Sequence, residues 1–102
     1  MATEVEYLAE ALEDAESAAR WYAERSPVAA VRFSEEVDAA EAAIAAHPDA
    51  WPSFDHGTRR YLLRRFPFSV IYDVQPDRIL IVAVAHARRR PGYWRPRRQQ
   101  PG

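Results

Sequence analysis

The chain has 102 residues and a net charge of -1, and 48% of its residues are hydrophobic and 28% are charged. These values are ordinary for one folded domain with a modest core. It has no cysteine, and His47, His56 and His86 lack metal-ligand spacing, so we expect no disulfide, no metal and no cofactor. No apolar run approaches the ~20 residues of a membrane span and no secretory pattern opens the sequence, so we expect a cytoplasmic protein without membrane contacts.

The first elements are predicted to be a short strand and a helix. Thr3–Tyr7 alternates polar and apolar residues, which is typical of a strand. From Ala9 the apolar spacing becomes helical, and acidic residues occupy the early turns, where the helix dipole favours negative charge. The apolar stripe expected on this helix consists of Leu8, Leu12, Ala15, Ala19 and Tyr22.

A second helix is predicted to follow almost at once. Ser26 and Pro27 end the first helix and begin the next, because proline suits a first helical position, and Pro48 ends the second helix. The short connection indicates an antiparallel helical hairpin. The apolar stripe of the second helix repeats at four-three-four spacing and consists of Phe33, Val37, Ala40 and Ile44.

The second half of the chain has the pattern of strands. A connector over 47–57 is expected to fold Trp51 and Phe54 back onto the core. Three strands are then predicted, and the last is apolar on both faces, which is typical of a buried central strand. They cover Arg60–Phe66, Phe68–Val74 and Arg78–Ala85.

The predicted fold is therefore α+β, in the order β-α-α-β-β-β, with the helical hairpin packed on a small, mostly antiparallel sheet. We expect residues 1–96 to form a single domain and residues 97–102 to form a flexible C-terminal tail. No internal repeat or linker divides the sequence.

Charge is distributed unevenly along the chain. Residues 1–55 contain 13 acidic residues and three arginines, whereas residues 56–102 contain 11 arginines and two acidic residues. Two ordinary solvated helices followed by a basic sheet would produce this pattern. A polyanionic partner for the basic half is the alternative, and the charge pattern leaves both open.

The order and spacing of five segments carry a resemblance to a known family. The segments are Arg20–Tyr22, Ser26–Pro27, Ala46–Pro52, Arg59–Phe68 and Ala85–Trp94. Together they resemble the RelE/ParE superfamily of toxins from bacterial type II toxin–antitoxin systems. The similarity runs through nearly the whole chain, and the predicted order of elements is similar to the fold of that superfamily.

The resemblance implies a toxin that inhibits growth, contributes to plasmid stabilisation and is neutralised by a cognate antitoxin. The flexible C-terminal segment of the antitoxin, with apolar anchors and acidic residues, would wrap the toxin. ParE-like members of the superfamily poison DNA gyrase and need no catalytic residues for it. RelE-like members cut mRNA in the ribosomal A site and are metal-independent endoribonucleases.

For RelE-like cleavage, the resemblance implies a catalytic set of arginines and one tyrosine: Arg64, Arg65, Arg88 and Tyr93. Cleavage through the 2′-hydroxyl needs proton transfer and stabilisation of a charged phosphorane. The arginines would hold and stabilise the phosphate, and Tyr93 would be the acid or base. His86 is a further candidate base, although a histidine after a strand more often forms a local hydrogen bond.

Two departures from the RelE-like pattern favour the ParE-like interpretation. Ser69 occupies the position where RelE-like nucleases carry a key arginine. Trp94, which cannot exchange a proton, aligns with the C-terminal aromatic residue, and Tyr93 lies one position early. A third interpretation, a non-toxic basic nucleic-acid-binding module, stays open.

Contacts with antitoxin or target are expected at arginines of the basic half and at the C-terminal aromatic residues. Arginines at a sheet edge also discourage edge-to-edge association, and the two aromatic residues are equally suited to closing the core. The expected contact residues are Arg59, Arg60, Arg64, Arg65, Arg88, Arg89, Arg90, Tyr93 and Trp94.

Overall fold

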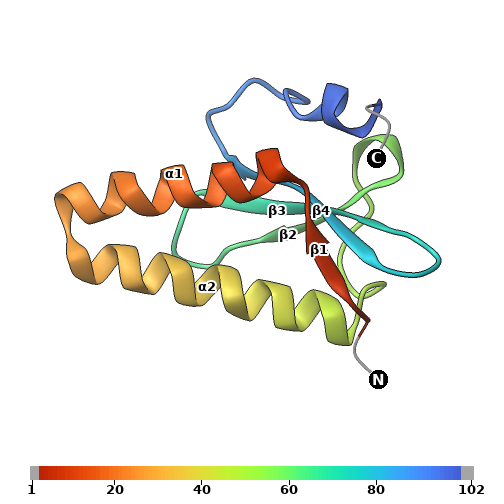
Figure 1. The fold of residues 1–102 in the computed structure, drawn as a ribbon, viewed down its shortest axis with the longest axis horizontal. Coiled ribbons are helices and arrows are strands. Elements are labelled where there is room, and N and C mark those ends of the chain that lie inside the picture. Colours follow the sequence, from red (N-terminus) through yellow and green to blue (C-terminus); the bar gives the residue numbers. More distant parts are fainter. Residues whose placement is uncertain (1–2, 100–102) are drawn as a thin grey trace.

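The computed structural model describes residues 3–99 as a four-stranded sheet with a helical hairpin on one face and the C-terminal segment on the other (Figure 1). The elements are β1 Val5–Tyr7, α1 Ala9–Arg25, α2 Pro27–Ala46, η1 Asp55–Gly57, β2 Arg59–Leu62, β3 Phe68–Val74, β4 Ile79–His86 and η2 Arg95–Gln99, where η marks a 3-10 helix. The predicted order of helices and strands is thus confirmed. The strand order is β1-β4-β3-β2, with β1 parallel to β4 and the other pairs antiparallel.

The helical hairpin turns at Ser26, as predicted. The backbone N–H of Ser26 donates to the carbonyl oxygen of Tyr22 (2.7 Å), and its hydroxyl accepts from the N–H of Ala29 (3.2 Å). Pro27 occupies the first position of α2. The predicted apolar stripe of α2 is confirmed, because all four of its residues are buried. None of the described helices is long and apolar enough to cross a membrane.

The buried face of α1 differs from the predicted stripe. Four of the five expected residues pack against the core, but Leu12 is 46% exposed, and Ala11 and Ala18 are buried in its place. Asp14 lies on the same side of the helix as these two alanines and accepts a hydrogen bond from β4. Because the Asp14 carboxylate lies on the buried face of α1, the spacing of apolar residues alone could not identify that face.

Strand β4 is the buried central strand, as predicted, and the sheet has a core on each side. The main core lies toward the helices, and an outer core contains Ile71, Ala83 and Trp94. The connector folds back as expected, since Trp51 packs against the main core and Phe54 against the outer core.

Strand β2 ends at Leu62, four residues earlier than predicted. The backbone N–H groups of Arg64 and Arg65 donate to Oε1 of Glu36 in α2, at 2.8 and 3.3 Å. The strand prediction was wrong here because a contact from α2 bends the chain, and this contact cannot be read from local alternation. Arg64 and Arg65 therefore lie in a turn rather than in the sheet.

Residues 87–99, called the C-terminal arm below, run along the outer face of the sheet (Figure 1). We expected a flexible tail from Arg97. The described part of that tail is instead held by ion pairs, from Arg97 to Asp14 at 2.7 Å and from Arg98 to Asp73 at 2.9 Å. Both partners are distant in sequence, which is why the tail pattern gave no sign of them. The rest of the expected tail lies outside the described residues.

Candidate functional site

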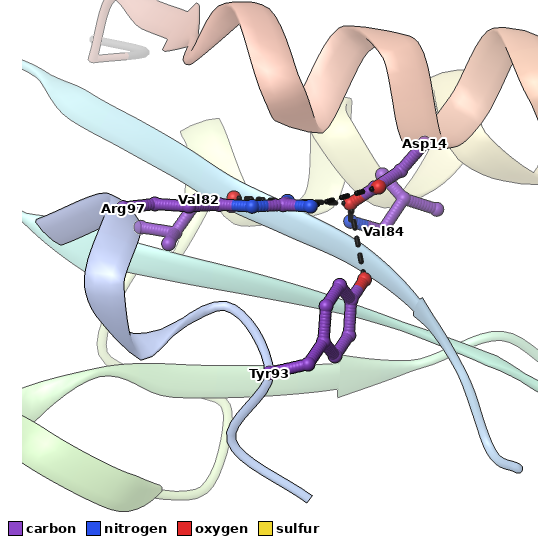
Figure 2. A network of polar contacts seen from close by, with 5 residues as sticks. All are labelled: Asp14, Val82, Val84, Tyr93 and Arg97. Carbon is purple, nitrogen blue, oxygen red and sulfur yellow. Dashed lines mark hydrogen bonds and ion pairs between the residues drawn. The ribbon is translucent and has the colours of Figure 1, made fainter. Parts of the chain in front are cut away.

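A largely buried polar network joins α1, β4 and the C-terminal arm (Figure 2). Oδ2 of Asp14 accepts hydrogen bonds from the backbone N–H of Val84 and from the hydroxyl of Tyr93, both at 3.1 Å. The guanidinium of Arg97 donates to the same oxygen at 2.7 Å and to the carbonyl oxygen of Val82 at 3.1 Å. The side chains of Asp14 and Arg97 are only 12% and 14% exposed, so these bonds compensate for their loss of water.

This network covers an open edge of the sheet. Strand β1 pairs with β4 only as far as Ile81, whose carbonyl oxygen also accepts the N–H of Leu8 (3.0 Å). Beyond Ile81, no strand within residues 3–99 pairs with this edge of β4. The Asp14 carboxylate and the Arg97 guanidinium therefore satisfy backbone groups that a neighbouring strand would otherwise pair.

An open groove of about 720 Å³ lies beside the network, between α1, the adjoining ends of β3 and β4, and the arm. The ring of Tyr22 packs 6.3 Å from that of Phe68 inside it, and Trp21 is 51% exposed at its side. The guanidinium of Arg25 lies 3.7 Å from the centre of the Trp21 ring. An open surface with exposed aromatic side chains is suited to the apolar anchors of a partner. The groove is lined by Glu13, Asp14, Ser17, Ala18, Trp21, Tyr22, Pro67, Phe68, Val84, His86, Arg89, Tyr93 and Arg97.

Two titratable groups of the groove form hydrogen bonds within the protein. Burial and the nearby Asp14 carboxylate raise the pKa of Tyr93 to about 12, so its hydroxyl stays protonated near neutral pH and donates to Asp14. Nδ1 of His86 accepts the N–H of Arg88 (2.9 Å), which is the local hydrogen bond expected after a strand. In neutral His86 the proton is then on Nε2. Neither group offers a free basic atom to the groove.

A second cavity, of about 160 Å³, lies on the outer face of the sheet between β2 and the arm. It brings together five of the expected contact residues, namely Arg60, Arg89, Arg90, Tyr93 and Trp94. Trp94 is only 1% exposed and its ring lies 6.2 Å from that of Phe54. Trp94 therefore closes the outer core, which is one of the two roles considered for it.

The other four expected contact residues lie elsewhere. Arg59 holds the connector, because its guanidinium donates to the carbonyl oxygen of Trp51 at 2.6 Å. Arg64 and Arg65 lie in the turn against α2, and Arg88 is exposed on the arm. The two cavities thus contain Tyr93 but none of the arginines of the set implied for RelE-like cleavage.

Two residues of the site were missed by the sequence analysis. Asp14 was grouped with the solvated acidic residues of the early helix turns, and Arg97 with the tail. One feature of the sequence indicates that Asp14 lies on the buried face of the helix. It comes three residues after Ala11 and four before Ala18, so it shares a helix face with these small residues. Within residues 3–99, no group of three or more histidine, aspartate or glutamate side chains could hold a metal ion.

A comparison with protein families decides the assignment. The model described as "ParE toxin of type II toxin-antitoxin system, parDE" matches residues 5–91. The chain belongs to this ParE toxin family. A ParE toxin of a toxin–antitoxin system implies an antitoxin partner. Tyr93, Trp94 and Arg97 lie beyond the matched region, so the polar network includes positions that the family match does not cover.

A comparison with solved structures agrees with the fold of this ParE-family toxin. The structure titled "Chromosomal ParDE TA system from P. aeruginosa" is similar to it, with a TM-score of 0.71 and 22% sequence identity. The similarity covers 82% of this chain and 95% of that chain, so the predicted fold class is confirmed. A comparison with curated proteins finds no significant match.

Proposed function

We propose that this ParE-family toxin inhibits growth by a non-nucleolytic action on DNA gyrase. The match of residues 5–91 to the ParE toxin model is the observation that carries the proposal. The gyrase target comes from the resemblance described above, in which ParE-like members poison gyrase. Such an action requires a rigid surface that binds the target, and it requires no assembled catalytic site.

The arrangement of the candidate catalytic residues supports the same proposal. The turn that carries Arg64 and Arg65 is bound to Glu36 of α2, whereas the hydroxyl of Tyr93 is bound to Asp14 of α1. Ser69 lines the outer cavity without supplying positive charge. A cleaving site would need a base and a cation that converge on one phosphate.

The test combines a DNA supercoiling assay on purified gyrase with transcriptome-wide mapping of new RNA 5′ ends after induction in bacterial cells. We expect growth arrest and inhibited supercoiling, without new ends phased to codons. Codon-phased ends within translated messages, with gyrase unaffected, would replace the proposal with ribosome-dependent cleavage. Normal growth despite stable expression would favour the non-toxic nucleic-acid-binding module.

We also propose that the antitoxin lays an amphipathic C-terminal segment in the groove of about 720 Å³. The exposed ring of Trp21 offers an apolar anchor, and Arg89 on the arm offers a positive charge for acidic residues of the segment. Because exposed charges are screened by salt, antitoxin binding should weaken as salt is added. A flat salt dependence would assign the affinity to the apolar anchors alone.

A further inference from the structure

The arginines of the basic half fall into two groups. Within residues 3–99, five of them pair with carboxylates, and six have no carboxylate oxygen within ion-pair distance of the guanidinium. The paired group is Arg59, Arg78, Arg95, Arg97 and Arg98. The other group is Arg60, Arg64, Arg65, Arg88, Arg89 and Arg90. The structure thus neutralises some arginines and leaves a defined set for external anions.

Three arginines of the second group meet at the outer cavity. Arg60 comes from β2, and Arg89 and Arg90 come from the arm. Ser69 adds a hydroxyl to the lining, which contains no aspartate or glutamate. Three like charges around one small cavity repel one another unless a counter-charge lies between them. No side chain of the described residues supplies that charge.

Two of these guanidinium groups are oriented by aromatic rings. Arg60 lies 4.4 Å from the centre of the Phe54 ring, and Arg89 lies 3.9 Å from the centre of the Tyr93 ring. A stack uses the face of a guanidinium and leaves its in-plane N–H donors available. None of the three side chains donates a hydrogen bond within residues 3–99. The cavity therefore presents oriented donors without acceptors.

From this arrangement we propose that Arg60, Arg89 and Arg90 form a binding site for a phosphate group of a nucleic-acid strand. Planar guanidinium groups match the oxygens of phosphate in geometry and in charge. A terminal phosphate of the strand offers three unbridged oxygens, one for each arginine, whereas a carboxylate or an internal phosphodiester offers two. The site lies on the outer face of the sheet, opposite the helices, and the proposal does not depend on the action on gyrase.

The test measures binding of the purified chain to a fluorescently labelled single-stranded oligonucleotide by anisotropy. The double variant Arg89→Gln/Arg90→Gln removes two charges at the cavity. Its matched control, Arg20→Gln/Arg32→Gln, removes two exposed charges from the helical hairpin, on the other face of the sheet. We expect the first variant to bind about tenfold or more weakly and the control to change by less than about threefold. Circular dichroism checks that both variants are folded.

Three further probes identify the ligand. Oligonucleotides with and without a 5′-phosphate distinguish a terminal phosphate from an internal one, and inorganic phosphate should compete with both. Amide chemical shifts of Ser69 and Gly92, which line the cavity, should move with inorganic phosphate, while those of Arg20 and Arg32, which do not line it, stay constant. Equal losses in both double variants, absence of binding, or competition by a glutamate-rich peptide but not by phosphate would each overturn the proposal.

Discussion

Asp14 and Arg97 lie 83 positions apart in sequence, yet the guanidinium of Arg97 donates to both oxygens of the Asp14 carboxylate, at 2.7 and 3.1 Å. This two-point pair joins the first helix to the C-terminal arm. It also satisfies the backbone of β4 where β1 ends. One wall of the groove therefore depends on a single pair of charges.

Replacing Asp14 with asparagine should lower the free energy of unfolding by about 3 kcal/mol, because it leaves the shielded charge of Arg97 without a partner. Urea unfolding measures the loss. Glu13→Gln is the matched control, since Glu13 pairs with Arg20 at 3.1 Å but both side chains are 64% exposed. The control substitution should lower the free energy of unfolding by less than about 1 kcal/mol. Equal losses would show that the buried pair contributes no more than a surface pair.

The stability contributed by Tyr93 should depend on alkaline pH. Because burial raises the pKa of Tyr93 to about 12 in the folded state, from 10.0, its contribution is complete below pH 10 and is lost as the pH rises through 12. The difference in unfolding free energy between the wild-type chain and Tyr93→Phe should therefore shrink over this interval. Tyr72, whose pKa is also raised to about 12, remains in both proteins and cancels in the comparison. A constant difference up to pH 12 would contradict the assigned burial.

Trp94→Ala should lower the free energy of unfolding by about 3–5 kcal/mol, since it empties the centre of the outer core. Chemical denaturation measures the effect, with Trp21→Ala as a control because half of that ring already faces solvent. Full stability of Trp94→Ala together with loss of toxicity would instead assign Trp94 to target contact.

Trp21→Ala should weaken binding of the cognate antitoxin about 30-fold, as expected when an aromatic anchor is removed. Isothermal titration calorimetry with the antitoxin or its C-terminal peptide measures this loss. Val31→Ala is the control, because Val31 is 60% exposed on α2 and does not line the groove. If both variants bind equally well, the antitoxin segment does not occupy the groove as proposed.

The predictable part of the fold follows from the local spacing of apolar residues and from the residues that begin and end helices. The four-residue stripe of α2, the turn at Ser26 and the doubly buried β4 each have a pattern within a few residues, and all three are confirmed. Strand β2 was predicted too long because Glu36, a residue of another element, binds the turn that follows it. Contacts between residues that are distant in sequence cannot be predicted from the local spacing of apolar residues.

The candidate site was predictable only in part. The cluster of arginines followed from charge counting, and five of the expected residues do share the outer cavity. Which arginines are neutralised depends on the tertiary partners of each one. Arg97 and Arg90 look alike in sequence, yet Arg97 is paired with Asp14, and Arg90 has no carboxylate partner within the described residues.

The pairing of β1 with β4 has a consequence for synthesis of the toxin. Residues 5–7 form a strand with residues 79–81, and Asp14 closes onto Arg97 later still. Contacts of such high sequence separation form slowly and cannot form before both partners have left the ribosome. The sheet and the wall of the groove are thus completed only late in translation. Because this groove is the proposed antitoxin site, an antitoxin segment could occupy it only after the last residues of the toxin have left the ribosome.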